Sequence, residues 1–210
     1  MSAEQNGYRN PFATPHEPGI NNRVIIGING KKGAGKSTIA KFIEDTYDYE
    51  EFAFANTLKG ACMLIFNLST PQLYGSQAEK EEIDDYWGVS PRTIMQELGT
   101  AIRNIEAAHP TLNKVWIRSL HRNIEAMKSK KVVVSDVRYQ DEADSIKEYE
   151  AKGWTAIIIK VVRPTTDSHG DTHESEVQEV KCDYTIENNG TRLDLFNDVK
   201  HIMRKVGEFK

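Results

Sequence analysis

The sequence predicts a three-layer α/β fold built around a mostly parallel β-sheet. Strand-like and helix-like segments alternate along the chain after residue 22. Two of the strand-like segments, VVVSD at 132–136 and TAIIIKV at 155–161, are continuous apolar runs. Such runs are typical of parallel strands that helices cover on both faces. A third apolar run leads into a glycine-rich turn and then a helix, which is the strand–turn–helix unit of α/β proteins.

The predicted elements can be placed one by one. Residues 1–22 contain three prolines and few aliphatic side chains, so we expect a flexible N-terminal leader and a single domain over 23–210. We expect the segment AEKEEIDD at 78–85 to be a solvated surface. The predicted strands are 24–28, 51–53, 131–135, 155–162 and 184–187, and the predicted helices are 37–47, 57–68, 91–104, 114–129, 140–152 and 192–206.

Composition narrows the classes of partner. The formal net charge of -4 gives no basic footprint, so we expect no nucleic-acid polymer as partner. No apolar run approaches the roughly 18 residues that a membrane span needs, so we expect no membrane partner. Cys62 and Cys182 lack C-x-x-C spacing and fit small core residues of a reduced compartment, the cytoplasm, or the host cytoplasm if a virus encodes the chain. A homodimer is possible.

The glycine-rich turn matches a phosphate-binding motif. Gly30, Gly35, Lys36 and Ser37 satisfy G-x-x-x-x-G-K-[ST], the P-loop pattern, between a predicted strand and a predicted helix. Its glycines let backbone N–H groups point at phosphate oxygens, and the helix adds its positive end. The alternative is an ordinary glycine-rich turn. The residues expected to hold the phosphates of a nucleotide are Gly30, Lys31, Gly33, Ala34, Gly35, Lys36, Ser37 and Thr38, with Lys36 on the β and γ phosphates and Ser37 on Mg²⁺.

A second nucleotide signal is VVVSDVR at 132–138, which places Asp136 at the carboxyl end of a strand. Ligands of open parallel sheets bind beyond these ends, so we expect Asp136 on the same rim as the P-loop. Its carboxylate could hold Mg²⁺ or accept a proton, and Arg138 could clamp a phosphate with two hydrogen bonds. The alternative is an aspartate that only caps the turn.

The predicted helix after Ser90 carries a polar stripe opposite its apolar face. A cation, an amide and a glycine gap could hold a nucleoside monophosphate and its base, although a solvated helix face explains the same stripe. Trp116 at the start of the next helix could stack on a base or pack at the edge of the core. The stripe consists of Arg92, Gln96, Gly99 and Arg103.

Two later segments are candidates for closing the site. The polar segment RPTTDSHGDTHESE at 163–176 suits a lid, with Arg163 stabilising charge on the transferring phosphoryl group. His169, His173 and Glu174 invite a zinc interpretation, which we disfavour because no third His or Cys completes the site. In IENNGT at 186–191, Asn188 could hydrogen-bond adenine, although the segment also fits a simple turn.

Taken in order, these segments resemble the deoxynucleoside monophosphate kinases best known from bacteriophages. The resemblance covers nearly the whole chain from Arg23 onward, in the P-loop with its preceding lysines, SPRTIMQELGT, KVWI, SDVRYQDEA, VVRP, HESE and IENNGT. It implies a P-loop NTPase fold with a helical substrate-binding insertion at about 57–130 and a lid at about 163–180. It also implies transfer of a phosphoryl group from ATP, with Mg²⁺, to a deoxynucleoside monophosphate.

The resemblance also assigns individual roles. Ser37 stands where several members have an aspartate, and Gly33 where a second basic residue is expected, so one acceptor-side cation is missing. On the donor side, the resemblance implies that Lys36, Ser37 and Thr38 hold the ATP phosphates and the metal, and that Asn188 contacts adenine. Lys32 would bridge the donor and acceptor phosphates, Asp136 and Arg138 would lie near the point of transfer, and Arg163 would be the lid arginine. The residues implied for the acceptor nucleotide are Arg92, Gln96, Gly99, Trp116 and Glu176.

Two other interpretations stay open. Animal phosphomevalonate kinase shares a P-loop, an SD-x-R strand end and a late Ser-Glu, but its acceptor has no base to occupy Gln96 and Trp116. A GTPase would carry N-K-x-D, and the sequence NKVW lacks the aspartate. A non-catalytic ATP-binding regulator would release no ADP in response to a phosphorylated acceptor.

Overall fold

The computed structural model describes residues 23–109, 114–164 and 179–209. At its centre is a five-stranded sheet in the order β2-β3-β1-β4-β5. Every neighbouring pair of strands is parallel, so the sheet is more regular than the mostly parallel one predicted. The strands are β1 (Val24–Asn29), β2 (Glu50–Phe52), β3 (Lys131–Val137), β4 (Thr155–Val162) and β5 (Tyr184–Glu187).

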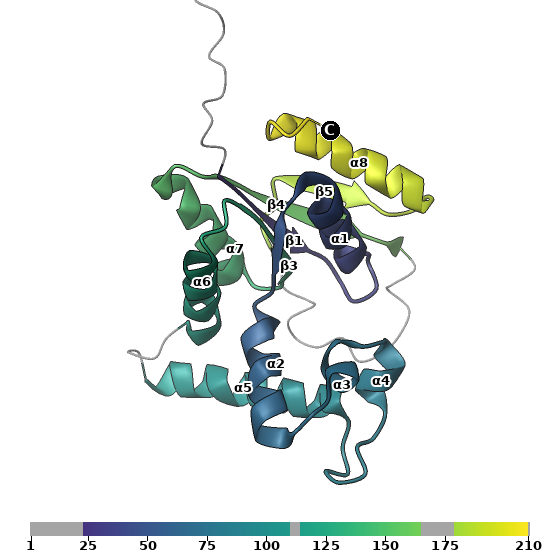
Figure 1. Ribbon diagram of the computed structural model, residues 1–210, viewed down its shortest axis with the longest axis vertical. Coiled ribbons are helices and arrows are strands. Elements are labelled where there is room, and N and C mark those ends of the chain that lie inside the picture. The colour runs from purple at the N-terminus through teal and green to yellow at the C-terminus, as the bar shows by residue number, and fades with distance from the viewer. Residues whose placement is uncertain (1–22, 110–113, 165–178, 210) are drawn as a thin grey trace, which may run out of the picture.

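Helices cover both faces of the sheet, as Figure 1 shows, so the predicted three-layer architecture is confirmed. Alternate residues of β1 point to opposite faces. Val24 and Ile26 pack in the cluster formed with α1 (Lys36–Tyr47) and α8 (Arg192–Lys205). Ile25 packs in the second cluster, to which α6 (Val115–Met127) and α7 (Gln140–Lys147) contribute. Burial of both faces explains why these strands read as unbroken apolar runs.

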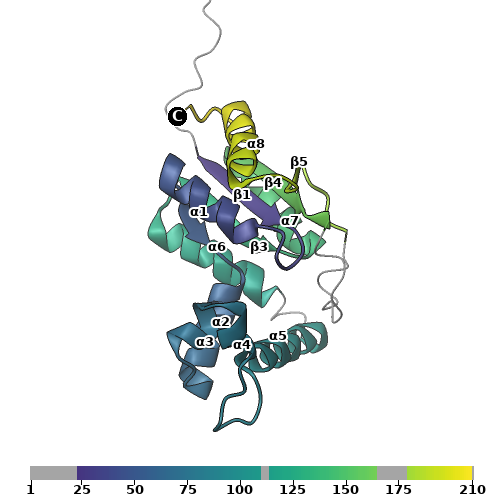
Figure 2. The ribbon, with the colours of Figure 1, turned by 90° about the vertical axis from the view of Figure 1, so that its right-hand side faces the viewer.

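A group of helices projects from the sheet on the side where its strands end (Figures 1 and 2). It has an apolar cluster of its own, built on Cys62, Leu68, Leu73 and Ile94. We call this group the helical part; it consists of α2 (Ala55–Phe66), α3 (Thr70–Tyr74), α4 (Gln77–Glu81) and α5 (Pro91–Ala108).

The sequence analysis missed the two short helices α3 and α4, because five residues are too few for a periodic pattern. A capping signal nevertheless marks both. Ser69 and Gln72 form a capping box at the start of α3, and Ser76 and Glu79 form one at the start of α4. The segment 78–85 is largely exposed, as predicted, although its first residues belong to α4.

The other elements lie close to their predicted ranges. The helix predicted at 91–104 continues to Ala108, and the one predicted at 140–152 ends at Lys147 and is followed by a 3-10 helix, Glu148–Lys152. The predicted leader at 1–22 lies outside the described residues. Among the described helices, none is both long and apolar enough to cross a bilayer.

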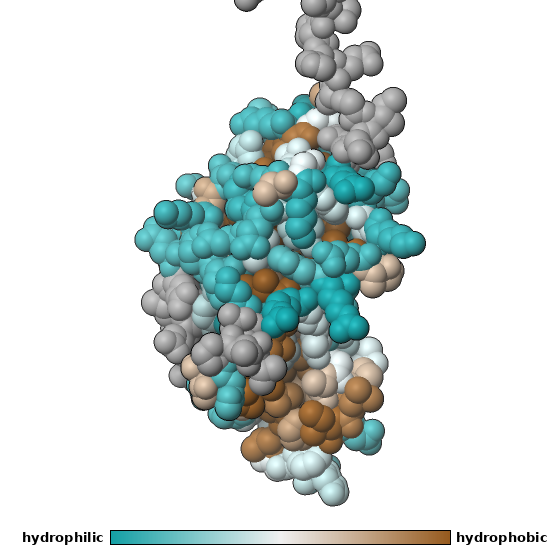
Figure 3. All heavy atoms as spheres, turned by 90° about the vertical axis from the view of Figure 1, so that its left-hand side faces the viewer, coloured by the Kyte–Doolittle hydropathy of each residue, from teal (hydrophilic) through white to brown (hydrophobic). Residues whose placement is uncertain are grey.

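An apolar surface covers the far end of the helical part, where Figure 3 shows hydrophobic residues gathered. The last turns of α2 contribute Leu64, which is 87% exposed, and Ile65, which is 62% exposed. Tyr86 and Trp87 add aromatic surface from the segment before α5. This surface does not by itself test the homodimer that the sequence analysis considered, which stays a prediction.

The packing of β1 against α7 leads to a first prediction. A Cβ at Gly27 would lie 2.7 Å from Ile158 Cδ1 and 2.8 Å from Ile146 Cδ1. Gly27→Ala should therefore lower the free energy of unfolding by about 1–3 kcal/mol, because the core has no room for a methyl group. Urea denaturation measures this change.

The matched control is Gly60→Ala in α2, where an added Cβ meets no atom within 4 Å. That change should be neutral or stabilising by up to about 1 kcal/mol, since alanine favours helices over glycine. A Gly27→Ala variant as stable as the wild-type chain would contradict the tight packing of β1 on α7.

Candidate functional site

A cleft of about 1420 Å³ opens at the carboxyl ends of the strands, between the P-loop and the helical part. The parallel register places the ends of β1, β3 and β4 on one rim, where parallel α/β proteins bind ligands. Among the described candidates, all but one line the cleft; Ala34 is fully buried behind the P-loop. Glu176 lies outside the described residues, as do His169, His173 and Glu174.

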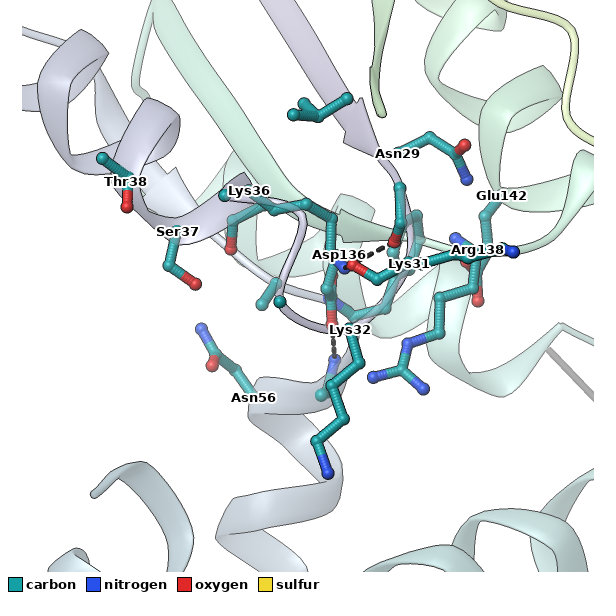
Figure 4. Close-up of a pocket in the computed structure, with 18 of the residues that line it drawn as sticks. Asn29, Lys31, Lys32, Lys36, Ser37, Thr38, Asn56, Asp136, Arg138 and Glu142 are labelled. Atoms are coloured by element: carbon teal, nitrogen blue, oxygen red, sulfur yellow. Dashed lines mark hydrogen bonds between the residues drawn. The ribbon is translucent and has the colours of Figure 1, made fainter. Parts of the chain in front are cut away.

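The P-loop has the strained backbone that its glycines allow. Gly30 and Gly35 have φ values of 151° and 112°, which favour glycine. A Cβ at Gly35 would also lie 2.7 Å from the Asn188 side chain. The Lys36 ammonium donates to the carbonyl oxygens of Gly30 and Lys31, the latter at 2.9 Å. The loop therefore wraps around its own lysine, at the start of α1 (Figure 4).

The side chain of Asn188 contacts the backbone of the P-loop. Its side chain is buried and its amide donates to the Ala34 carbonyl oxygen at 2.8 Å. The structure thus gives Asn188 a bracing contact that the sequence analysis did not foresee. Its contact with adenine stays a prediction, although it lines the cleft.

Asp136 joins the rim of the sheet to the helical part. Its two carboxylate oxygens accept hydrogen bonds from the backbone N–H groups of Phe54 and Ala55, at 2.8 and 2.9 Å. The carboxylate thus caps the start of α2, a contact that differs from the cap of its own turn considered in the sequence analysis. It also faces the cleft beside the P-loop (Figure 4), and each oxygen keeps a second lone pair.

The two cations predicted on the acceptor side meet on one carboxylate. Glu81 at the end of α4 lies 2.8 Å from the Lys32 ammonium and 3.1 Å from Arg92 Nε. Arg92 also donates to the side-chain oxygen of Gln77. Figure 4 shows Lys32 extending into the same space as Arg138. Lys32 and Arg92 therefore share one counter-ion, Glu81.

The predicted base-binding residues form the opposite wall. Gln96 is exposed in the cleft, and Gly99 lies below it on α5, where an added Cβ would meet Leu58 at 3.4 Å. Trp116 is only 9% exposed and packs in the apolar core beside the cleft. The packing at the edge of the core is therefore confirmed, whereas stacking on a base stays a prediction, although Trp116 also lines the cleft.

The sequence analysis missed a buried carboxylate at this site. Glu142 is 3% exposed and accepts hydrogen bonds from the backbone N–H groups of Arg138 (2.8 Å) and Tyr139 (3.2 Å). Its other oxygen lies 3.0 Å from the Arg103 guanidinium, which stacks 3.9 Å from the centre of the Tyr139 ring. Burial raises the pKa of Glu142 to about 7, against the opposing effect of these hydrogen bonds. Its sequence signal was its place in a capping box, because Glu142 is the third residue of α7 and bonds back to Tyr139, which precedes that helix.

Two lysines of the helical part, Lys59 and Lys80, also line the cleft and were missed. No sequence motif marks Lys59 and Lys80, because the direction of their side chains depends on how α2 and α4 pack. Among the described residues, no three His, Cys, Asp or Glu side chains group closely enough to hold a metal ion. Any metal held by the described residues would therefore be bound by fewer protein groups, as when phosphates and water complete the shell.

Comparison with known proteins identifies the family. The family model described as deoxynucleotide monophosphate kinase matches residues 73–199, more than half of the chain. A protein of Acanthamoeba polyphaga mimivirus that is named after the same family is 38% identical over 191 residues, which cover 84% of this chain and 94% of that protein. The chain belongs to the deoxynucleotide monophosphate kinase family. The family match includes α4 to α7 and therefore much of the wall opposite the P-loop.

Several solved structures match most of the length of the chain at low identity. The APS kinase of Mycobacterium tuberculosis in complex with AMPPNP and APS is 11% identical, with a TM-score of 0.46 over 87% of this chain and 98% of that one. The shikimate kinase of Aquifex aeolicus is 14% identical, with a TM-score of 0.44 over 87% and 96%. Because these TM-scores are below 0.5, the assignment of the fold does not rest on these structures. The P-loop kinase fold is assigned from the parallel sheet and the P-loop of this chain.

The buried Glu142 leads to a prediction about pH. The folded chain keeps the Glu142 proton up to a pH near 7, whereas the unfolded chain releases it near 4.5. The free energy of unfolding should therefore fall as pH rises through this window, by up to about 3 kcal/mol from this group alone. Glu142→Gln should remove this part of the slope, measured by urea denaturation at a series of pH values.

The control is Glu97→Gln on α5, an exposed change that should leave the slope as in the wild-type chain. Equal slopes for Glu142→Gln and the wild-type chain would show that Glu142 is ionised throughout this window.

Proposed function

We propose that this chain transfers the γ-phosphoryl group of ATP to a deoxynucleoside monophosphate, giving ADP and the deoxynucleoside diphosphate. The main support is the arrangement of the cleft, in which a P-loop on one side faces a basic wall of the helical part on the other. Membership of the family agrees with this arrangement. A donor and an acceptor nucleotide can approach each other from the two sides.

On the donor side, the P-loop would hold the ATP phosphates. The Lys36 ammonium, now bonded to loop carbonyl oxygens, would exchange these contacts for β and γ oxygens, while Lys31, Gly33 and Thr38 line the same turn. The hydroxyl of Ser37 and the carboxylate of Asp136 are oxygen donors of the kind that suits Mg²⁺, and both face the cleft. When bound there, Mg²⁺ would neutralise charge between the β and γ phosphates.

On the acceptor side, the reaction requires positioning more than acid–base chemistry. An oxygen of the acceptor phosphate forms a bond to the γ-phosphorus while the bond from that phosphorus to the bridging oxygen breaks, and ADP leaves. The acceptor oxygen is already ionised near neutral pH, so no strong base is needed. Arg138 and Lys32 would hold the two phosphates in line, and Arg92 would support the acceptor.

The nucleoside of the acceptor would contact the wall formed by Gln96, Gly99 and Trp116. Arg163 follows β4 and lines the cleft, so it can place a cation near the transferring phosphoryl group. The predicted lid at 163–180 lies mostly outside the described residues, and Glu176 with it. We retain the lid and acceptor binding by Glu176 as parts of the proposal, together with an adenine contact by Asn188.

The function is tested by Mg²⁺-dependent release of ADP from ATP in the presence of different acceptors. The panel contains each deoxynucleoside monophosphate, each matching ribonucleotide and phosphomevalonate. We expect turnover with one or more deoxynucleotides and loss of turnover when EDTA removes Mg²⁺. Activity on phosphomevalonate alone would favour the rival kinase, and ADP release that no acceptor stimulates would favour the regulator.

The role of Lys36 is tested by Lys36→Ala. Turnover should fall by about 100-fold or more, because this ammonium stabilises charge on the transferring phosphoryl group. Stability should change less than turnover, since the hydrogen bonds of the ammonium to the Gly30 and Lys31 carbonyl oxygens lie within the P-loop. Lys41→Ala is the control, because Lys41 lies on the exposed side of the same helix and pairs with Glu44 and Asp45. Normal turnover in folded Lys36→Ala protein would refute the assignment.

A further inference from the structure

Two cations on the helical side of the cleft have no role in the scheme above. Lys59 extends from α2 and Lys80 from α4, and both side chains line the cleft and are half-buried. The ammonium of Lys59 lies 4.3 Å from the centre of the Tyr74 ring of α3. An aromatic face attracts a cation and fixes its position without neutralising it.

Lys59 and Lys80 also differ from the other cations of this wall in their lack of counter-ions. Lys32 and Arg92 share Glu81, and Arg103 pairs with Glu142. In the part of the chain that the structure describes, neither Lys59 nor Lys80 has a carboxylate at ion-pair distance or a hydrogen-bond acceptor.

The electrostatic surroundings of the two lysines are unfavourable to their charges. Burial lowers the pKa of Lys59, and the positive charges of Lys80 and Arg138 lower it further, against the attraction of Asp136 and Glu51. Burial also lowers the pKa of Lys80, and Arg92 adds to this effect. Partly desolvated cations without partners reduce stability. An anionic ligand between them would remove this cost.

The position of Lys59 and Lys80 in the cleft indicates which anionic ligand they would bind. ATP phosphates belong to the P-loop, where Lys36 and the start of α1 lie. Lys59 and Lys80 come from the opposite wall, and their electrostatic neighbours, Arg138 and Arg92, are the predicted acceptor-side arginines. Lys59 also follows, by about one helical turn, the start of α2 that Asp136 caps.

We propose that Lys59 and Lys80 bind the phosphate group of the acceptor deoxynucleoside monophosphate, with the Tyr74 ring positioning the Lys59 ammonium. This inference rests on the function proposed above. A dianionic phosphate between these lysines would compensate their charges without breaking the contacts of Glu81 with Lys32 and Arg92. Every acceptor nucleotide carries this phosphate, so the two lysines contribute affinity but do not distinguish bases.

The experiment compares Lys59→Met, Lys80→Met and the double variant with a matched control, Lys130→Met. Methionine keeps most of the length of lysine and removes the charge. Lys130 is exposed and precedes β3, at the end of the sheet away from the cleft. Initial rates are measured for each accepted deoxynucleotide, with ATP and acceptor varied separately.

We expect Lys59→Met to raise the KM for the acceptor by about 10-fold or more, as for the loss of one charge-assisted contact. The double variant should raise it further, while the KM for ATP stays within about twofold. The loss should be the same factor for every accepted base. A loss that differs between bases would place Lys59 beside the base instead, and a raised KM for ATP would assign it to the donor. Either result would overturn the proposal, as would an unchanged acceptor KM.

Two measurements separate phosphate binding from a structural role. Calorimetry should show weaker binding of the deoxynucleotide to Lys59→Met but unchanged binding of the deoxynucleoside, which lacks the phosphate. The Tm of the ligand-free variant should be unchanged or higher, because an uncompensated charge has been removed. A lower Tm with equal losses for nucleotide and nucleoside would show that Lys59 only supports the fold.

The wild-type protein separates this proposal from the broader one. If the wild-type and Lys130→Met proteins phosphorylate no deoxynucleotide, the proposed function fails. If both are active and Lys59→Met binds the deoxynucleotide as well as they do, the function stands and the role of the lysines is refuted.

Discussion

The hydrogen-bonded pairing of β1 with β3 on one side and β4 on the other is the interaction on which the rest of the structure depends. Because both pairings are parallel, the chain leaves all three strands at the same edge. The P-loop follows β1, Arg163 follows β4, and Asp136 lies at the carboxyl end of β3. Their assembly into one rim therefore requires no long-range side-chain contact, only the register of the sheet.

A second constraint is the attachment of the helical part to this rim. Asp136 caps the start of α2, and Glu142 connects Arg103 of α5 with the backbone after β3. Both contacts involve carboxylates at the carboxyl end of β3 or in the helix after it. The position of the helical part thus depends on these polar contacts as well as on the apolar packing of Leu58 and Ile102 against the cluster beside the sheet. Such contacts can change with ligand or pH more easily than a packed core can.

The charges of the cleft follow a pattern that helps to explain its chemistry. Some cations already have a carboxylate at ion-pair distance, as Lys32 and Arg92 have in Glu81. Others, such as Lys59, have an aromatic ring beside them and, in the described structure, no carboxylate at ion-pair distance, although Asp136 and Glu51 attract the charge from farther away. Two nucleotides with several negative charges must approach each other here, and an excess of cations lowers the repulsion between them.

The sequence by itself determined the layered fold, the P-loop and the position of Asp136 at a strand end, because strand burial, glycine turns and helix starts are encoded by local patterns. It also indicated the polar face of α5, although a solvated helix would show the same spacing. Only the tertiary structure decided that Asp136 caps α2, that Glu81 joins Lys32 to Arg92, and that Lys59 faces the cleft. These contacts join residues far apart in the chain, and the direction in which a short helix points depends on its packing rather than on its own residues.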